Sequence, residues 1–154
     1  MSNILTFRLA VPSEQRALEN LQRDASLVWE DDRAALLEHP DAIELPIEQI
    51  TGGRTIVAER AGGTVGFAVV LRREDGDAEL DGLFVDPRCW GQGIGRALIA
   101  ESVNLSLEEG CSVLHVIANP RAMDFYKKLG FLALVEVPTR FRPAFRMRKD
   151  IVKS

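Results

Sequence analysis

Apolar side chains occur along the chain in short runs, or alternate with polar ones, and turn-forming residues separate these segments. Segments of this kind are typical of β-strands. The strands that the pattern predicts comprise residues 3–9, 54–60, 65–73, 78–85, 111–118, 131–137 and 142–148. The short turns "AGGT" and "EDGD" separate the second, third and fourth strands, and therefore predict antiparallel hairpins.

Helical spacing of apolar residues predicts helices between several of these strands. Ser13 is expected to cap a first helix that buries Leu18, Leu21, Ala25 and Val28 on one face. Further helices are predicted over residues 30–38, 94–109 and 120–129, with a short helical turn after Pro46.

Residues at the helix boundaries support this assignment. Gly110 follows the helix at 94–109, where a left-handed cap residue is common, and Asn119-Pro120 is typical of a helix start. The order strand, helix, strand after residue 78 implies a right-handed parallel crossover. We therefore expect an α/β (α+β) fold with a mixed sheet, in one domain comprising residues 1–154.

The composition narrows the class of protein. The chain has 154 residues, of which 46% are hydrophobic, and no apolar run approaches the length of a membrane helix. Its N-terminal residues lack a basic start and an apolar core, so no secretory signal and no membrane partner are expected. A net charge of −4 argues against nucleic acid as a partner. The two cysteines, Cys89 and Cys111, have no metal-binding or redox spacing, and a cytoplasmic location is expected.

The charge is unevenly distributed. Residues 11–50 carry ten acids against three arginines, a net of −7, and residues 138–154 carry six bases against Asp150, a net of +5. The simplest interpretation is a solvated face at each end of the chain.

Three glycines at alternate positions, Gly91, Gly93 and Gly95, lie between a predicted strand and a predicted helix. Glycine allows positive φ and lets an anion approach the backbone, and the following helix N-terminus favours negative charge. This arrangement suits a phosphate group, although a turn that only packs the helix against the strand would look alike. No Walker sequence occurs, and the spacing Gly-x-Gly-x-x-Gly is not met, which disfavours an ATPase or a nicotinamide enzyme.

The segment "ELDGLFVDPRCWGQGIGRALI" resembles the acetyl-CoA-binding motif of the GNAT superfamily of N-acetyltransferases, Gln/Arg-x-x-Gly-x-Gly/Ala. Trp90 stands where that motif usually has Gln or Arg. A second block, "VIANPRAMDFYKKLGF" at residues 116–131, resembles a later motif of the same family. The two blocks occur in the family's order.

The resemblance implies further expectations. The sheet would have six to seven strands, mostly antiparallel, with a parallel and splayed pair of fourth and fifth strands and helices on both faces. Acetyl-CoA would be the co-substrate, no metal would be needed, and a homodimer is possible. The residues expected to contact the cofactor are Phe84, Val85, Gln92, Gly93, Ile94, Gly95, Arg96, Asn119 and Tyr126.

Acetyl transfer requires a base for the acceptor amine and a proton for the leaving thiolate. The resemblance points to Glu79 as the base, while Asp81 on the same strand face and a water relay remain alternatives. It also points to Tyr126 as the group that faces the CoA sulfur, as a full acid or as a hydrogen-bond donor. A backbone N–H near Val85 would stabilise the oxyanion.

The sequence therefore predicts an N-acetyltransferase that transfers acetyl directly to a primary amine of a small molecule, amino acid or peptide. The alternative is a catalytically silent CoA-binding regulatory module. In the family the acceptor site is formed by the first two helices and the last loop, here residues 13–51 and 137–145. Their opposite charges favour an acceptor with both an amine and a carboxylate.

Overall fold

The computed structural model of the chain describes residues 4–139 and 143–152. Within them lie seven strands: β1 (Thr6–Leu9), β2 (Thr55–Arg60), β3 (Gly63–Arg72), β4 (Ala78–Val85), β5 (Val113–Ala118), β6 (Leu132–Val137) and β7 (Ala144–Asp150). The helices are α1 (Gln15–Leu27), α2 (Glu30–Glu38), α3 (Ile47–Thr51), α4 (Ile94–Glu108) and α5 (Met123–Lys128). Single 3₁₀ turns are η1 (Pro12–Glu14), η2 (Pro40–Ala42), η3 (Pro87–Cys89) and η4 (Pro120–Ala122).

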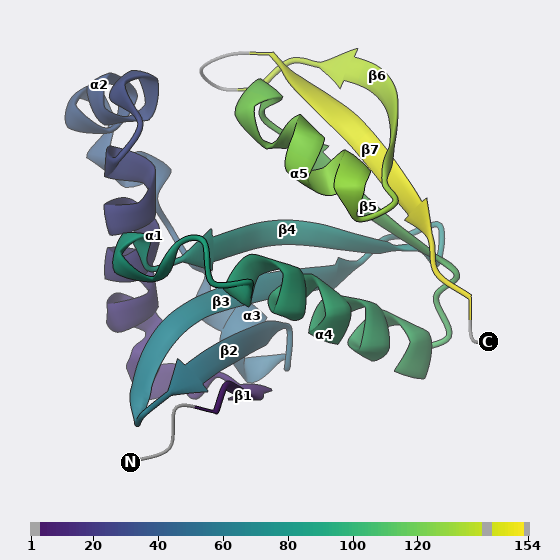
Figure 1. Ribbon diagram of the computed structural model, residues 1–154, viewed down its shortest axis with the longest axis horizontal. Helices are drawn as coiled ribbons and strands as arrows, with labels where there is room; N and C mark the ends of the chain where they lie inside the picture. The colour runs from purple at the N-terminus through teal and green to yellow at the C-terminus, as the bar shows by residue number, and fades with distance from the viewer. Residues whose placement is uncertain (1–3, 140–142, 153–154) are drawn as a thin grey trace. The chain divides into compact units, whose positions relative to one another are not determined.

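The strands form one mixed sheet in the order β1-β2-β3-β4-β5-β7-β6 (Figure 1). β4 and β5 are parallel, whereas β1 with β2, β2 with β3, β5 with β7 and β6 with β7 are antiparallel. The parallel register comprises three residue pairs, from Ala78↔Leu114 to Leu80↔Val116, although β4 itself continues to Val85. The mixed, mostly antiparallel sheet with a short parallel pair confirms the predicted fold class.

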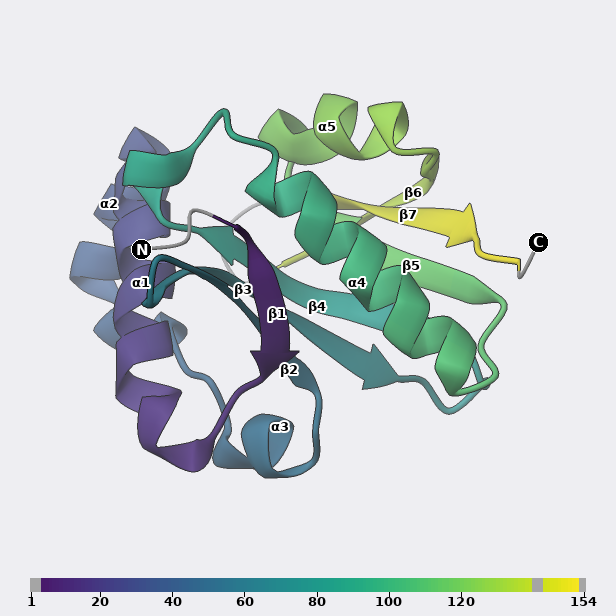
Figure 2. The same ribbon diagram turned by 60° about the horizontal axis from the view of Figure 1, so that its bottom comes forward.

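The chain divides into two compact units, the first comprising Met1–Val69 with Gly82–Glu101 and the second Val70–Asp81 with Ser102–Ser154. β3, β4 and α4 therefore contribute residues to both units. The first unit carries α1, α2 and α3 with β1 and β2, and Figure 2 shows β1 alongside β2. The single domain of the sequence prediction stays a prediction.

The core of the first unit lies on both faces of its strands. Val57 and Ala58 are consecutive in β2 and are both fully buried, as are Phe67 and Ala68 in β3. Because neighbouring side chains of a strand point to opposite faces, both faces of these strands are covered. Leu98 of α4 lies over the Cα of Gly66 on one of them.

In the second unit the two faces of the strands differ. Leu114, Val116 and Met147 are buried on one face, and Val116 pairs with Met147 in the register of β5 and β7. Glu79, His115 and Arg148 occupy one row of the other face, because Glu79 pairs with His115 and His115 with Arg148. One face is thus mostly apolar, with Lys149 opposite Leu114, and the other carries several charged groups.

The predicted cap at Ser13 is wrong. Ser13 lies inside η1, and the helix start is held by Glu14, whose carboxylate accepts a hydrogen bond from the amide of Val11 (2.9 Å) and pairs with the guanidinium of Arg8 (2.7 Å). The chain has therefore already turned before Ser13, which cannot cap from inside the turn. Val28, predicted to be buried, is 44% exposed because α1 ends at Leu27.

Most other boundaries are within two residues of the prediction. Gly110 has a φ of 83° and ends α4 as expected. The predicted strand at 142–148 is β7, which ends at Asp150; residue 3 of the first predicted strand and residues 140–142 lie outside the described residues. No helix in the described part of the chain is long and apolar enough to span a membrane.

Gly66 generates a prediction about stability. A Cβ on Gly66 would lie 2.9 Å from the carbonyl oxygen of Phe84 and 3.1 Å from Leu98 Cδ1, whereas a Cβ on Gly63 of the same strand would have only ordinary contacts. We expect Gly66→Ala to lower the free energy of unfolding by about 1–3 kcal/mol because it overpacks the first unit. Gly63→Ala is the matched control and should change it by less than about 0.5 kcal/mol. Urea unfolding measures both, and equal midpoints would contradict this packing.

Candidate functional site

The glycine loop (residues 91–96) adopts the conformation that the sequence predicted. Gly91 and Gly93 have φ values of 80° and 79°, in the left-handed region, and a Cβ at either would meet no atom within 4 Å. The two glycines are therefore required by the backbone conformation and not by close packing.

The loop ends as the N-terminus of α4. The carbonyl of Gly93 accepts a hydrogen bond from the amide of Ala97 (3.0 Å), the first bond of the helix. The amides of Ile94, Gly95 and Arg96 therefore belong to the first turn of α4 and have no acceptor within the helix. The Ile94 side chain is 2% exposed and fixes the position of this turn. Gln92 and Arg96 are exposed beside these amides.

Asp86 holds the preceding turn. Its Oδ1 accepts a hydrogen bond from the amide of Arg88 (3.0 Å), and its Oδ2 pairs with the Arg88 guanidinium (2.7 Å). The hydrogen bond from the Arg88 side chain is the main reason why the pKa of the Asp86 carboxyl lies below its usual range. The Asp86 amide donates to the carbonyl of Val65 (2.9 Å), which ties the end of β4 to β3.

Trp90, the residue that departs from the motif, has two partners. Its indole Nε1 donates a hydrogen bond to the carbonyl of Val85 (2.8 Å). Its ring stacks on Trp29, with centroids 5.6 Å apart and planes inclined by 23°. Nothing in the local sequence pattern marked Trp29, because the stack joins residues that lie far apart in the chain.

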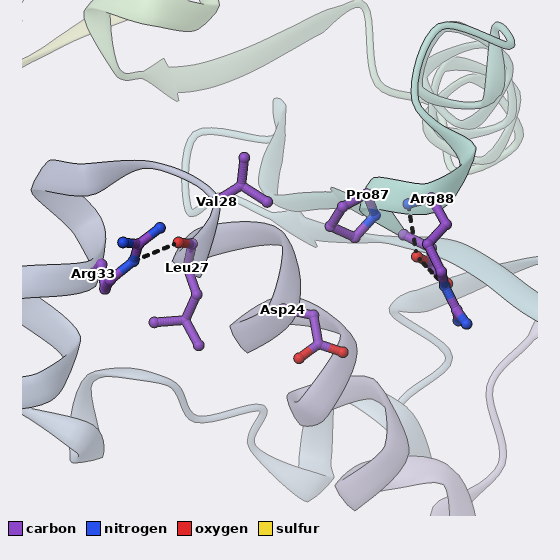
Figure 3. A pocket seen from close by; sticks show the side chains of 7 residues that line it. Asp24, Leu27, Val28, Arg33, Pro87 and Arg88 are labelled. Atoms are coloured by element: carbon purple, nitrogen blue, oxygen red, sulfur yellow. Dashed lines mark hydrogen bonds and ion pairs between the residues drawn. The ribbon is translucent and has the colours of Figure 1, made fainter.

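A pocket of about 420 Å³ lies between the end of α1, the start of α2 and η3 (Figure 3). Asp24, Leu27 and Val28 of the α1 end line one side, and Pro87 and Arg88 of η3 line another. A second pocket of about 230 Å³ shares three of its lining residues, Asp24, Asp86 and Arg88. Acidic and basic side chains thus lie together in this part of the first unit.

Glu79, the predicted base, belongs to the second unit. Its Oε1 accepts hydrogen bonds from Nη1 of Arg73 (3.2 Å) and Nη1 of Arg146 (3.1 Å), and its side chain is 21% exposed. Both arginines therefore bind the same oxygen of the Glu79 carboxylate. The two arginines were missed from the sequence, since Arg146 comes close only through the pairing of β5 with β7. Asp81, the alternative base, is exposed on the same strand.

Tyr126 lies on α5 and is 7% exposed. Its ring makes edge-to-face contacts with Phe125 and Phe131, with centroids 5.2 and 5.3 Å away. Burial raises the pKa of the phenol above its usual value, so the hydroxyl is protonated at neutral pH. It can therefore donate a hydrogen bond.

Asn119 is the helix cap that its sequence context predicted. Its Oδ1 accepts a hydrogen bond from the amide of Ala122 (3.0 Å), and Pro120 occupies the first position of η4. The cap uses only the carbonyl oxygen of the side chain. The NH₂ group is not part of it.

Asp75, Asp77 and His115 offer three ligand atoms within 4.8 Å of one another. Asp77 Oδ2 lies 2.9 Å from His115 Nε2, and Asp75 pairs with Arg73 and accepts from the amide of Asp77. These contacts form a hydrogen-bonded network that sequence spacing did not reveal. The expectation that no metal takes part stays a prediction.

Two substitutions of Asp86 distinguish the stability that its cap contributes from the stability that its ion pair with Arg88 contributes. Asp86→Ala should lower the free energy of unfolding by about 0.5–2 kcal/mol, because the Arg88 amide loses its acceptor. Asp86→Asn is the control and should retain most of the stability, since an amide also caps and Arg88 is 88% exposed. Because the pKa of Asp86 is depressed by folding, the small advantage of aspartate over asparagine should be present above about pH 4 and decline below it. Unfolding curves from pH 3 to 7 measure these free energies. Equal stabilities of the Ala and Asn variants would contradict the role of Asp86 as a cap.

Comparison with known proteins places the chain among acetyltransferases. A protein of Bos taurus named thialysine N-epsilon-acetyltransferase is 42% identical over 60 residues, which cover 37% of this chain and 35% of that protein. The matched stretch thus represents about a third of the length of that relative.

Two solved structures share the fold over nearly the whole chain. The PaiA N-acetyltransferase of Thermoplasma acidophilum, solved in complex with coenzyme A, has a TM-score of 0.77 and 17% identity over 96% of this chain and 99% of that one. Ard1 of Thermoplasma volcanium has a TM-score of 0.75 and 21% identity over 97% of this chain and 99% of that one. The sequence model of the acetyltransferase (GNAT) family matches residues 16–131. The chain therefore belongs to the acetyltransferase (GNAT) family.

Proposed function

We propose that the chain is an acetyl-CoA-dependent N-acetyltransferase that transfers acetyl directly to a primary amine. The observation that carries this proposal is the glycine loop, in which left-handed Gly91 and Gly93 precede the free amides of α4. Free amides at a helix N-terminus, without side chains in front of them, fit the pyrophosphate of CoA. Structures of relatives with bound coenzyme A support the same ligand.

The cofactor contacts follow the motif residue by residue. In the first unit we assign them to Phe84, Val85, Gln92, Gly93, Ile94, Gly95 and Arg96. In the second unit we assign them to Asn119, through its NH₂ group, and to Tyr126. The amide of Asp86 is already bonded to Val65, so the oxyanion donor is sought at the neighbouring amide of Val85.

Acetyl-CoA supplies the acetyl group as a thioester, and the residues of this chain manage the protons. The acceptor amine attacks the carbonyl carbon, the carbon–sulfur bond breaks, and one proton leaves the nitrogen. Two guanidinium groups occupy Oε1 of Glu79, which leaves Oε2 to take this proton directly or through a water. Asp81 is the alternative base on the same strand.

Tyr126 is best suited to donate a hydrogen bond to the departing sulfur. A thiol has a pKa near 8.5 and an ordinary phenol near 10, so full proton transfer to the thiolate is already uphill. Burial raises the phenol pKa further, which makes complete transfer less favourable still. Of the two roles left open by the sequence, the structure therefore favours hydrogen-bond donation.

The acceptor class rests on charge. Residues 11–50 have a net charge of −7, which favours a cationic amine, although the pocket beside α2 carries both acids and arginines. The basic C-terminal segment would accept a carboxylate, although Arg140 and Arg142 lie outside the described residues. An amino acid or peptide terminus meets both conditions. A cytoplasmic location and a homodimer remain predictions.

The alternative is a CoA-binding regulatory module without transfer activity. The engagement of Glu79 by Arg73 and Arg146 favours it, because a carboxylate held by two cations resembles a structural ion pair. Incubation with acetyl-CoA and a library of amines, with free thiol followed over time, separates the two. Tight CoA binding without thiol release for any acceptor would support the regulatory module.

A substitution of Gly93 tests whether the glycine loop binds CoA. Gly93→Ala should weaken CoA binding by roughly ten-fold, because an L-residue resists the φ of 79° by about 1–2 kcal/mol and the loop turns away from the ligand. Gly76→Ala is the matched control, since Gly76 has a φ of 88° and equally open surroundings but lies outside the loop. Calorimetric titration with CoA is the measurement. Equal affinities of the two variants would remove the loop from the cofactor site.

A substitution of Tyr126 tests whether its hydroxyl takes part in acetyl transfer. Tyr126→Phe keeps the ring contacts with Phe125 and Phe131 but removes the hydroxyl, so kcat should fall by about a hundred-fold and CoA affinity by much less. Thiol release measures kcat, and calorimetry measures affinity. An unchanged kcat would exclude Tyr126 from the reaction.

A further inference from the structure

The chain has two tryptophans, and they stack on each other. Trp29 is 40% and Trp90 39% exposed, so neither ring is part of the hydrophobic core. A stacked pair of aromatic rings is worth more than the area that it buries. The pair therefore joins two surface segments that no strand pairing connects.

Trp90 fixes the segment that leads into the glycine loop. Its indole N–H reaches back to the carbonyl of Val85, the last residue of β4, and the turn between them is closed by the bond from the Cys89 amide to the Asp86 carbonyl (2.8 Å). Gly91 follows Trp90 directly and has a left-handed φ. The Trp90 side chain therefore anchors the residue that directly precedes the glycine loop.

Trp29 fixes the corner between α1 and α2. Its carbonyl accepts the first hydrogen bond of α2, from the amide of Arg33 (2.8 Å), and its amide donates to the carbonyl of Ser26 in α1 (3.2 Å). Its backbone is extended, with φ −91° and ψ 125°, so one helix ends and the next begins around this residue.

The pocket of Figure 3 is lined by these same two segments. Val28 is adjacent to Trp29 in the chain, and Arg88 lies two residues before Trp90. The stack thus joins two segments whose neighbouring residues line the pocket. Loss of the stack would free the glycine loop and the α1–α2 corner to move independently.

We propose that Trp29, which lies outside the glycine motif, is a positioning residue for CoA. Its stack on Trp90 holds residues 86–91 in place and so presets the amides of the glycine loop before CoA binds. A preset loop has less conformational freedom to lose, and CoA binds more tightly for that reason. The inference rests on the proposed function.

The coupling also works in the opposite direction. Because linkage is reciprocal, CoA that favours the ordered loop must also favour the stacked state of Trp29. The α1–α2 corner, which we assign to the acceptor side, is then more ordered when CoA is bound. This gives a physical reason for CoA to bind before the acceptor.

The test is a double-mutant cycle measured by calorimetric titration with CoA. Trp29→Leu and Trp90→Leu each remove one ring of the stack and should each weaken CoA binding by roughly two- to ten-fold. In the Trp90→Leu background, Trp29→Leu should have no further effect, because its partner is already gone. Trp29→Phe retains a ring and should retain most of the affinity.

Leu37→Ala is the matched control. Leu37 is a large apolar residue of α2 that is 76% exposed, and its removal should leave the CoA affinity unchanged. Urea unfolding of each variant shows whether a loss of affinity comes from a loss of fold. A variant that unfolds is replaced in the cycle by its Met counterpart, which fills more of the space but also has no ring to stack.

Tryptophan fluorescence provides an independent readout, because the only two tryptophans of the chain form the stack. Emission should change during a CoA titration with the same midpoint as calorimetry. An unchanged CoA affinity in Trp29→Leu, or additive effects of the two substitutions, would overturn the inference while Gly93→Ala still tests the loop. Absence of CoA binding by the unmodified chain would overturn the proposed function, and this inference with it.

Discussion

The conformation of Gly93 is the constraint on which the rest of the site depends. Its positive φ turns the chain from the loop into α4, and its carbonyl accepts the first helical hydrogen bond from Ala97. Ile94 follows immediately and is buried, which anchors the first turn of α4. The outcome is a first helical turn whose amides have no acceptor within the helix and can therefore bind an anion. The Asp86 turn holds the segment that leads into this loop.

The charged face of the second unit differs from the glycine loop, because its polar groups bind one another. Here polar groups are numerous, and most of them are engaged with one another: Arg73 and Arg146 with Glu79, and Asp77 with His115. Such engagement fixes the geometry of Glu79 but also occupies one of its oxygens. Tyr126, by contrast, is held by aromatic rings in an apolar environment, which keeps its hydroxyl protonated. The two groups are thus suited to accept a proton and to donate a hydrogen bond, respectively.

The sequence predicted those features that depend on interactions between residues close together in the chain. Alternation of apolar residues located the strands, and the glycines, the Asn119 cap and the Gly110 cap were readable because each satisfies a backbone requirement within a few residues. The cap at Ser13 failed because the first turn begins after Val11, which places Ser13 inside the turn and not in front of it. The predicted burial of Val28 was wrong because apolar periodicity does not show where a helix ends.

The sequence by itself determined the order of the strands and helices, the glycine loop and the family motifs. These depend on backbone preferences and on burial of periodic apolar faces, which act over short distances along the chain. Only the tertiary structure decided that Trp90 would stack on Trp29, and that Arg146 would reach Glu79 from a strand 67 residues away. Such contacts depend on the register of β5 with β7 and on where α1 ends, and no short sequence pattern encodes which distant side chains these place together.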